Sequence, residues 1–325
     1  MKIYDIASVC NALMDVLIEI DDSDIQKLGL TKGIMHLVDS QRQRDVLAQF
    51  ANKPKVTELG GSSMNAIRTL ASLGHKTVFV GMVNDDEYGH RIRERMNALG
   101  IKSYLGGHTE ESTGTCLILI TPDGERTMNT NLGASRLYDS SLIPHQDIAN
   151  SHVFHFCGYQ WDTAQQKQAL KHSIDTAHKN NTIISFDLAD PFVVDRNRDD
   201  FIAMIDSEAD IVFANREEAK LLFKTSPHDT ARRIAASGSI AVVKMGADGA
   251  VIAKGEELFE VPPISTQVVD TTAAGDMFAA GFLHGFLKGR DLATCGKIAT
   301  ILASDVISRV GAVVSGKALD QARKL

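Results

Sequence analysis

The chain has 325 residues, of which 44% are hydrophobic and 23% charged, and its formal net charge at pH 7 is −7. This length can bury a large core, and the composition indicates an ordered globular protein with one large α/β body and a smaller appendage. The negative charge argues against general binding to nucleic acid or anionic membranes, although it is compatible with a local basic pocket for a phosphate.

The cysteines and the N-terminal segment indicate the cellular compartment. Cys10, Cys116, Cys157 and Cys295 have no paired spacing, so we expect free thiols in a reducing compartment rather than disulfides or a zinc site. Asp5 and Asn11 interrupt the first apolar run, which is therefore not typical of a signal peptide, and no run of about 18 apolar residues could cross a bilayer. We expect a cytoplasmic protein.

Short apolar runs typical of strands alternate with longer amphipathic runs along the chain. The strand-like runs are 77–83, 153–157, 183–187, 211–214 and 240–245. Between them, the helix-like runs 63–73 and 162–179 end at small or polar residues. This alternation predicts repeated βαβ units around a mostly parallel sheet, folded as one body.

Two stretches, residues 16–39 and 102–132, are richer in strand signals than in helix signals. In the second, residues 116–121 and 126–131 are joined by Pro122-Asp123-Gly124-Glu125, which is typical of a hairpin turn. We interpret both stretches as a small β-sheet lid inserted into the α/β body. A lid would favour phosphoryl transfer to a hydroxyl group, because closure excludes competing water and aligns the reactants.

The most informative motif is Val268-Val269-Asp270-Thr271-Thr272-Ala273-Ala274-Gly275-Asp276, which precedes the apolar run 277–287. A helix N-terminus exposes unpaired N–H groups, and the small residues Ala273, Ala274 and Gly275 would let a phosphoryl group approach them. Asp276 would then lie where it could accept a proton from an attacking hydroxyl. For a bare Ala-Gly-Asp, a helix cap would be the simpler interpretation, but the longer string favours an anion site.

Other segments place glycines and polar residues around predicted strand ends. Gly60 and Gly61 precede a helix whose first turn carries Asn65, so that backbone and amide could face a hydroxylated ligand, although such a pair alone more often marks a turn. Asn215 and Glu218 have the spacing of a capping box, and carboxylates at a strand end also suit the water shell of a nucleotide-bound Mg²⁺.

The segment Lys244-Met245-Gly246-Ala247-Asp248-Gly249 follows the last predicted parallel strand. Its glycines, Gly246 and Gly249, are compatible with the passage of a nucleotide close to the backbone. A hairpin turn is an equally good interpretation of the same residues.

Together these segments resemble the ribokinase-like (PfkB) family of carbohydrate and nucleoside kinases along nearly the whole chain. The resemblance rests on Gly60-Gly61 with Asn65, the string from Gly81 to Gly89, Asn215 with Glu218, Lys244-Met245-Gly246 and, above all, Asp270 to Asp276. It implies one kinase domain over residues 1–325 with a three-layer α/β/α fold, a mostly parallel central sheet and a small β-sheet lid.

The resemblance also implies Mg-ATP-dependent phosphorylation of a primary hydroxyl. Asp276 matches the general base, and the amides of Ala273, Ala274 and Gly275 match the donors that stabilise the transferring phosphoryl group, with Arg126 helping to neutralise its charge. The matching nucleotide-binding positions are Asn215, Lys244, Gly246, Gly249 and Thr271, and Mg²⁺ would be held through water by Asn215 and Glu218. The family usually has glycine at the position of Ala273.

Within the family, several segments are similar to those of adenosine kinases. The similarity implies that Asn11 and Asp15 belong to the ribose-binding segment, where Asp15 would hold the 2′ and 3′ hydroxyls together with the residues around Gly60, Gly61 and Asn65. Residues 113–116, Arg126 and 131–134, including Leu132, are similar to the lid and its exit. Residues 158–161 resemble a segment with an aromatic near the purine, so Tyr159 or Trp161 could stack on a base, although Trp161 could equally be an ordinary core or surface aromatic.

The family often binds a monovalent cation, such as K⁺, beside the anion loop. The matching positions are Asp270, Thr272, Gly311 and Ser315, so the resemblance implies that a cation there would help to fix the loop.

The sequence therefore predicts a cytoplasmic ATP-dependent kinase that phosphorylates the 5′-hydroxyl of adenosine in purine salvage, with ATP, Mg²⁺ and a small-molecule acceptor as its ligands. Ribose, another nucleoside or a ketose remains open as the acceptor. A non-catalytic nucleoside-binding regulator with the same fold is a further alternative. We expect no nucleic-acid or membrane partner, and either a monomer or a homodimer formed through the lid.

Overall fold

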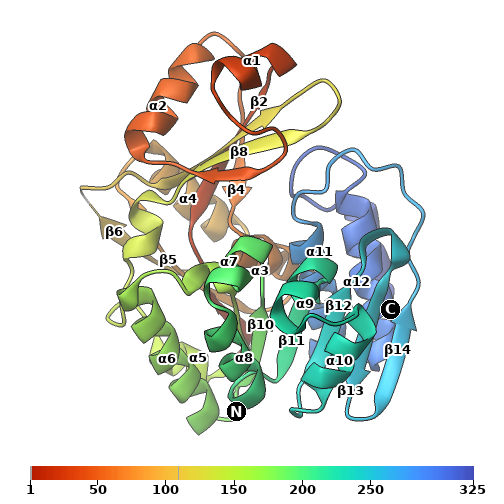
Figure 1. Ribbon diagram of the computed structural model, residues 1–325. Coiled ribbons are helices and arrows are strands. Elements are labelled where there is room, and N and C mark those ends of the chain that lie inside the picture. Colours follow the sequence, from red (N-terminus) through yellow and green to blue (C-terminus); the bar gives the residue numbers. More distant parts are fainter. Residues whose placement is uncertain (1, 109) are drawn as a thin grey trace.

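The computed structural model of the protein describes residues 2–108 and 110–325. Within these residues, a nine-stranded sheet lies between two layers of helices, and a separate five-stranded sheet lies at the top of the view in Figure 1. In spatial order the large sheet contains β14 (Glu257–Val261), β13 (Ala250–Lys254), β12 (Ile240–Lys244), β11 (Ile211–Asn215), β10 (Ile183–Asp187), β9 (Ser151–Cys157), β1 (Tyr4–Val9), β5 (Thr77–Asn84) and β6 (Lys102–His108).

The strands from β12 to β6 run parallel to one another, and only the two pairings at one edge, β12 with β13 and β13 with β14, are antiparallel. The predicted mostly parallel sheet is therefore confirmed. Its strands are continuous apolar runs because helices cover both faces of the sheet.

Two buried clusters of apolar side chains separate the sheet from its helical layers. One layer contains α5 (His145–Ala149), α6 (Ala164–Lys179), α7 (Pro191–Arg196), α8 (Arg198–Ser207), α9 (Arg216–Phe223) and α10 (Pro227–Ala235). The other contains α3 (Ser62–Ser72), α4 (Glu87–Ala98), α11 (Ala274–Leu287) and α12 (Leu292–Val306), and α13 (Gly316–Lys324) packs on α12. This arrangement is the predicted three-layer α/β/α fold.

The predicted helix ends follow from local chemistry. The Thr163 hydroxyl accepts a hydrogen bond from the Gln166 amide, so α6 begins with a capping box, and the helix ends before Asn181, whose φ is +51°. The helix α3 begins after Gly61 and is followed by Gly74, whose φ of +94° suits glycine.

The small sheet contains, in spatial order, β3 (Met35–Leu37), β8 (Arg126–Asn131), β7 (Gly114–Ile120), β2 (Leu13–Glu19) and β4 (Val56–Gly60). The strands β7 and β8 form the predicted antiparallel hairpin. The small sheet also carries α1 (Asp22–Lys27) and α2 (Ser40–Gln49), which lie over it at the top of Figure 1.

The bounds of the small sheet differ from the predicted stretches 16–39 and 102–132. Residues Lys102–His108 form β6 at the edge of the large sheet, because they complete a βαβ unit with β5 and α4. The small sheet starts earlier, at Leu13, and gains β4, which the sequence analysis did not identify. The first predicted stretch, residues 16–39, also contains the short helix α1, whose capping box starts at Asp21.

The two faces of the small sheet have different surroundings. Alternate residues of β2 and β7, such as Val16, Ile18 and Leu117, pack against Ile25 of α1 and Val46 of α2. The side chains of Leu17, Cys116 and Ile118 form a separate apolar group on the same strands. Both Cys116 and Ile118 line the large cleft described below, so this second face looks toward the α/β body.

The four cysteines are free and buried, as expected from their spacing. Among the described residues, no helix combines the length and apolar character needed to cross a membrane.

Candidate active site

A cleft of about 1240 Å³ lies where the small sheet meets the carboxyl ends of the parallel strands. Ligand pockets commonly measure about 300–1,000 Å³, so this cleft has room for more than one small molecule. Its walls include most of the predicted site residues, namely Asn11, Asp15, Gly61, Asn65, Arg126, Leu132, Tyr159, Trp161, Asn215, Glu218, Lys244, Gly246, Gly249, Thr271, Thr272, Ala273, Ala274, Gly275 and Asp276.

The segment 270–275, here called the anion loop, leads directly into α11. Ala273 is the residue that precedes the first helical turn, and its φ of +59° is left-handed. An L-residue adopts this conformation at a cost of about 1–2 kcal/mol, which glycine would avoid. The first amides of the helix are thus presented to the cleft by a strained loop.

Asp276 lies in the first turn of α11, half-buried in the wall of the cleft. The Ser62 hydroxyl donates to its Oδ1 at 2.6 Å and the Asn65 amide donates to its Oδ2 at 2.8 Å. Burial raises the pKa of Asp276, and these two hydrogen bonds oppose that rise. The result is an oriented carboxylate that is a better proton acceptor than an exposed aspartate.

Lys244, at the end of β12, brings a positive charge to the anion loop. A Cβ atom built on Gly275 would lie 3.1 Å from the Lys244 Nζ, which places the amine against the start of α11. The same amine is 3.2 Å from the carboxylate of Asp187 at the end of β10. Although burial opposes it, the charges of Asp187 and Glu218 raise the pKa of Lys244, so the amine is protonated.

Asn215 and Glu218 form the predicted capping box at the start of α9. The Asn215 amide N–H donates to Glu218 at 2.7 Å, and the Asn215 side chain accepts from the Glu218 N–H at 2.9 Å. Burial raises the pKa of Glu218 to about 7. Across the described residues, no three His, Cys, Asp or Glu side chains are grouped to ligate a metal ion directly.

Gly60 and Gly61 are glycines because the neighbouring strand β2 and the segment before it approach them closely. A Cβ atom on Gly60 would lie 2.0 Å from the Asp15 Oδ1, and one on Gly61 would lie 2.3 Å from the Asn11 carbonyl oxygen. The φ of Gly61 is also +106°. The glycine pair therefore does more than form a turn: it allows β2 and β4 to bring Asp15 into the cleft.

Asp15 is buried in an environment of several charges. Burial raises the pKa of Asp15 to about 7, the cations Arg68 and Arg126 oppose the rise, and the carboxylates of Glu58 and Asp276 add to it. A carboxylate held in such a site can accept hydrogen bonds from ligand hydroxyls.

Residues 27–318 match the pfkB family of carbohydrate kinases. The chain belongs to this family. A structure of an adenosine kinase from Sinorhizobium meliloti is 33% identical, covers 99% of both chains and has a TM-score of 0.90. A probable sugar kinase from Rhizobium etli is 35% identical, covers 100% of this chain and 99% of its own, and has a TM-score of 0.92.

Among relatives compared by sequence, the adenosine kinase of Saccharomyces cerevisiae is 26% identical over 93% of this chain and 94% of its own length. The protein is therefore a phosphotransferase of the pfkB family. Similarity to both sugar kinases and adenosine kinases leaves the acceptor to be argued from the cleft.

Tyr159 and Trp161 of this pfkB-family kinase both line the cleft, but their contacts differ. The Trp161 indole donates to the Asp200 carboxylate at 2.7 Å, and the amines of Lys167 and Lys171 lie 5.5 and 5.7 Å from its ring centroid. Tyr159 is half-buried. Another aromatic residue, Phe192 of α7, is 54% exposed and also lines the cleft, although the sequence analysis did not identify it.

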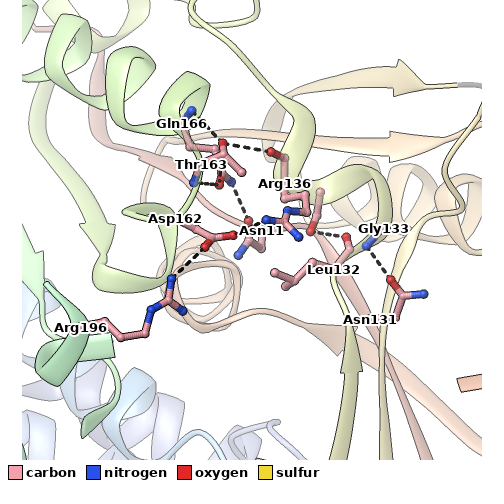
Figure 2. A network of polar contacts seen from close by, with 10 residues as sticks. Asn11, Asn131, Leu132, Gly133, Arg136, Asp162, Thr163, Gln166 and Arg196 are labelled. Atoms are coloured by element: carbon pink, nitrogen blue, oxygen red, sulfur yellow. Dashed lines mark hydrogen bonds and ion pairs between the residues drawn. The ribbon is translucent and has the colours of Figure 1, made fainter. Parts of the chain in front are cut away.

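A network of polar contacts holds Asn11 and the neighbouring cleft wall in place (Figure 2). The Gln166 amide in the first turn of α6 donates to the Asn11 Oδ1 at 3.1 Å. This hydrogen bond orients the Asn11 side chain. Arg136 and Arg196 both form ion pairs with Asp162, at 3.1 and 3.5 Å, and so join the exit of the small sheet to α7.

The structure brings together only part of the predicted monovalent-cation site. The Asp270 carboxylate accepts from the Thr272 amide at 2.9 Å and the Gly311 amide at 3.0 Å. It also forms an ion pair with Arg126. Ser315 has a different role, because its hydroxyl donates to Asp305 at 2.6 Å and caps α13. These residues do not fit a potassium site of the expected composition.

The remaining predicted residues have local structural roles that are compatible with binding. Gly246 and Gly249 lie in the turn between β12 and β13, as the hairpin interpretation predicted, and a Cβ on Gly249 would lie 2.1 Å from the Val261 carbonyl oxygen. Thr271 is exposed in the cleft, and Leu132 is the first residue after β8.

The sequence analysis missed Asp187 and Ser62. Asp187 is the last residue of a predicted strand, so the rule that ligands bind at the carboxyl ends of parallel strands could have identified it. Ser62 directly follows the predicted Gly60-Gly61 pair, but its contact with Asp276 joins residues 214 positions apart and has no local signal.

Proposed function

We propose that this kinase transfers the γ-phosphoryl group of Mg-ATP to the 5′-hydroxyl of adenosine. The observation that carries the proposal is the position of Asp276, at the start of α11 and in the wall of the cleft, between donors from α3 and the Lys244 amine. In the proposed reaction, Asp276 accepts the proton of the attacking hydroxyl.

The phosphate end of the cleft is proposed to be the N-terminus of α11. The Ala274 amide donates a long hydrogen bond of 3.3 Å to the Thr271 carbonyl, which a bound phosphate could replace. The amides of Ala273, Ala274 and Gly275, together with the Lys244 amine, would neutralise charge on the transferring group. Arg126, whose Nε has no hydrogen-bond acceptor among the described residues, would add a further donor. Mg²⁺ would supply charge neutralisation on the phosphates, and the carboxylates of Glu218 and Asp187 would hold its water shell.

The acceptor end is proposed to lie between the small sheet, which carries Asp15, and the aromatic residues Tyr159 and Phe192 of the α/β body. The side chain of Asp15 would accept hydrogen bonds from the ribose hydroxyls, and Asn11 and Asn65 would assist it. A broad apolar wall suits a purine better than it suits a bare sugar. This wall includes Leu13, Met35, Leu37, Ile118, Met128, Leu132, Tyr159 and Phe192.

We further propose that the kinase acts as a monomer in the cytoplasm, where it would return adenosine to the nucleotide pool. The helices α1 and α2 pack on the outer face of the small sheet, so apolar side chains of this face, such as Val16, Ile18 and Leu117, are buried within the chain rather than available to a second sheet. The opposite face looks into the cleft. The four buried free thiols suit a reducing compartment.

An acceptor panel tests the proposal. The purified protein is incubated with Mg-ATP and adenosine, other nucleosides, ribose or a ketose, and ADP release is measured together with the phosphorylated product. We expect the highest kcat/KM with adenosine and a product phosphorylated at the 5′ position. Preference for ribose or a ketose would replace adenosine with that acceptor. Adenosine binding without ADP release from any acceptor would instead support the non-catalytic regulator.

A further inference from the structure

Asp270 is a buried carboxylate whose partners come from three parts of the chain. Its exposed fraction is 3%, and its two oxygens accept hydrogen bonds from the amides of Thr272 and Gly311. Two amide hydrogen bonds do not neutralise a buried negative charge, so a cation is needed close to it. The structure provides this cation from the small sheet.

Arg126, the first residue of β8, reaches from the small sheet to the anion loop. Its Nη2 forms an ion pair with the Asp270 Oδ2, and its Nη1 donates to the Thr272 hydroxyl at 2.7 Å. The guanidinium thus contacts two of the four residues at which the family resemblance implied K⁺. With 8% of its surface exposed, Arg126 is nearly as inaccessible as Asp270.

The other two implied ligands are also engaged by protein groups. Ser315 uses both its amide and its hydroxyl to bind Asp305, at 2.7 and 2.6 Å. Gly311 packs against Glu58 of the small sheet, because a Cβ atom there would lie 2.9 Å from the Glu58 Oε2. The next residue, Ala312, donates its amide to the same carboxylate at 3.4 Å.

We propose that Arg126 is the permanent cation of the anion loop, so that this kinase needs no monovalent metal ion, and that Arg126 couples the small sheet to the loop. A potassium ion placed at Asp270 would lie against the guanidinium, and two like charges in a buried site repel strongly. The guanidinium stays protonated at all physiological pH values and is attached to the chain, so its presence does not depend on the salt. The inference concerns the unliganded fold and stands without the proposed acceptor.

The thermal unfolding of the protein without nucleotide tests this role. Melting temperatures are compared in equal concentrations of KCl, NaCl and choline chloride for the wild type, for Arg126→Ala, and for Arg233→Ala as a control. Arg233 forms a half-exposed ion pair with Asp206 and lies outside the cleft. We expect the wild type and the control to melt within about 1 °C in the three salts. Arg126→Ala should melt several degrees lower in choline chloride and recover part of this loss in KCl, because a metal ion can enter the vacated space.

A second variant keeps the test decisive if Arg126→Ala does not fold. Arg126→Lys retains the charge and should remain insensitive to the choice of cation, although its single amine cannot bind both Asp270 and Thr272. Potassium-selective stabilisation of the wild type would overturn the proposal. So would an Arg126→Ala protein whose melting temperature is lowered equally in all three salts.

The proposed kinase activity gives an independent readout. The initial rate of ADP formation by the wild type should be the same in KCl and in choline chloride. A rate that depends on K⁺ would overturn the inference and leave the proposed acceptor intact. Absence of any turnover would contradict the proposed function but leave the unfolding experiment valid.

Discussion

One wall of the cleft is made by consecutive residues of a single loop and helix, whereas the opposite wall is assembled from strands that are distant in the sequence. The anion loop and the first turn of α11, here called the phosphate wall, span the consecutive residues 270–276. Distant residues, among them Ser62, Arg126 and Lys244, contact this segment but do not form its backbone. The acceptor wall combines β2, β4, β7 and β8, whose pairings join residues up to about a hundred positions apart. The comparison teaches that the backbone of the phosphate wall comes from one short segment of the sequence. The acceptor wall forms only when distant strands pair in the folded protein.

Asp276 lies where the two walls meet, so its substitution should have the largest effect. Asp276→Asn keeps the volume of the side chain but removes the basic oxygen, and general-base catalysis contributes roughly 10²- to 10⁴-fold to rate. We expect kcat to fall by about that factor, while adenosine binding by calorimetry and the melting temperature change little. A variant with near-normal kcat would show that Asp276 is not the base.

Gly60→Ala should affect the acceptor wall alone. The added methyl would lie 2.0 Å from the Asp15 Oδ1, so Asp15 or β4 must move. Overpacking typically costs about 1–3 kcal/mol, which corresponds at its upper end to roughly a 100-fold rise in the KM for the acceptor.

Gly107→Ala is the matched control, because nothing lies within 4 Å of a Cβ atom there. The KM for ATP should stay constant in both variants, measured by varying ATP at saturating acceptor. Equal effects on both substrates would mean that the two walls are not independent.

Lys244→Met should affect the phosphate wall. The variant loses the amine beside Gly275, and we expect kcat/KM for ATP to fall by about tenfold or more, since charged hydrogen bonds to phosphate are strong. Lys254→Met, an exposed lysine on the neighbouring strand β13, is the control. Because Asp187 would lose its buried partner, the assay is run well below the melting temperature of the variant. Unchanged use of ATP would remove Lys244 from the site.

The smallest expected effect is a pH-dependent change in the free energy of unfolding, which Asp15→Asn isolates. Burial raises the pKa of Asp15 to about 7, so the folded protein resists ionisation of this group and loses stability as the pH rises toward and through 7. From pH 6 to pH 8, the wild type should lose about 1.4 kcal/mol of unfolding free energy relative to the variant, which carries no charge. Urea unfolding at the two pH values measures this difference. A constant difference would show that Asp15 does not titrate in this range.

The contrast between the walls also explains what could be predicted from the sequence. The anion loop, the capping box of Asn215 and Glu218 and the parallel strands were predicted because their signals lie within a few residues. The strand β4 was missed because its sequence, Val56–Gly60, is short and half-polar. Its identity as a strand comes from its pairing with β2.

Side-chain partnerships across the fold could not be predicted in the same way. Sequence gave no reason to join Arg126 to Asp270, or Ser62 to Asp276, because each contact depends on how the small sheet or α3 packs against α11. The functions of Asp276 and Asp15 remain predictions that the experiments above test. The position of Ser315 shows the opposite case, where a local helix cap replaces an implied ligand.

The close contact between α11 and α12 has a consequence for how ATP would be received. A Cβ atom on Gly281 would lie 2.6 Å from the Ala299 Cα, and one on Gly285 would lie 2.9 Å from the Cys295 Sγ, so the two helices touch along their backbones. A helix fixed in this way cannot rotate without opening the core. The amides at its first turn are therefore immobilised when the chain folds, and little further ordering entropy is lost there when a phosphate arrives.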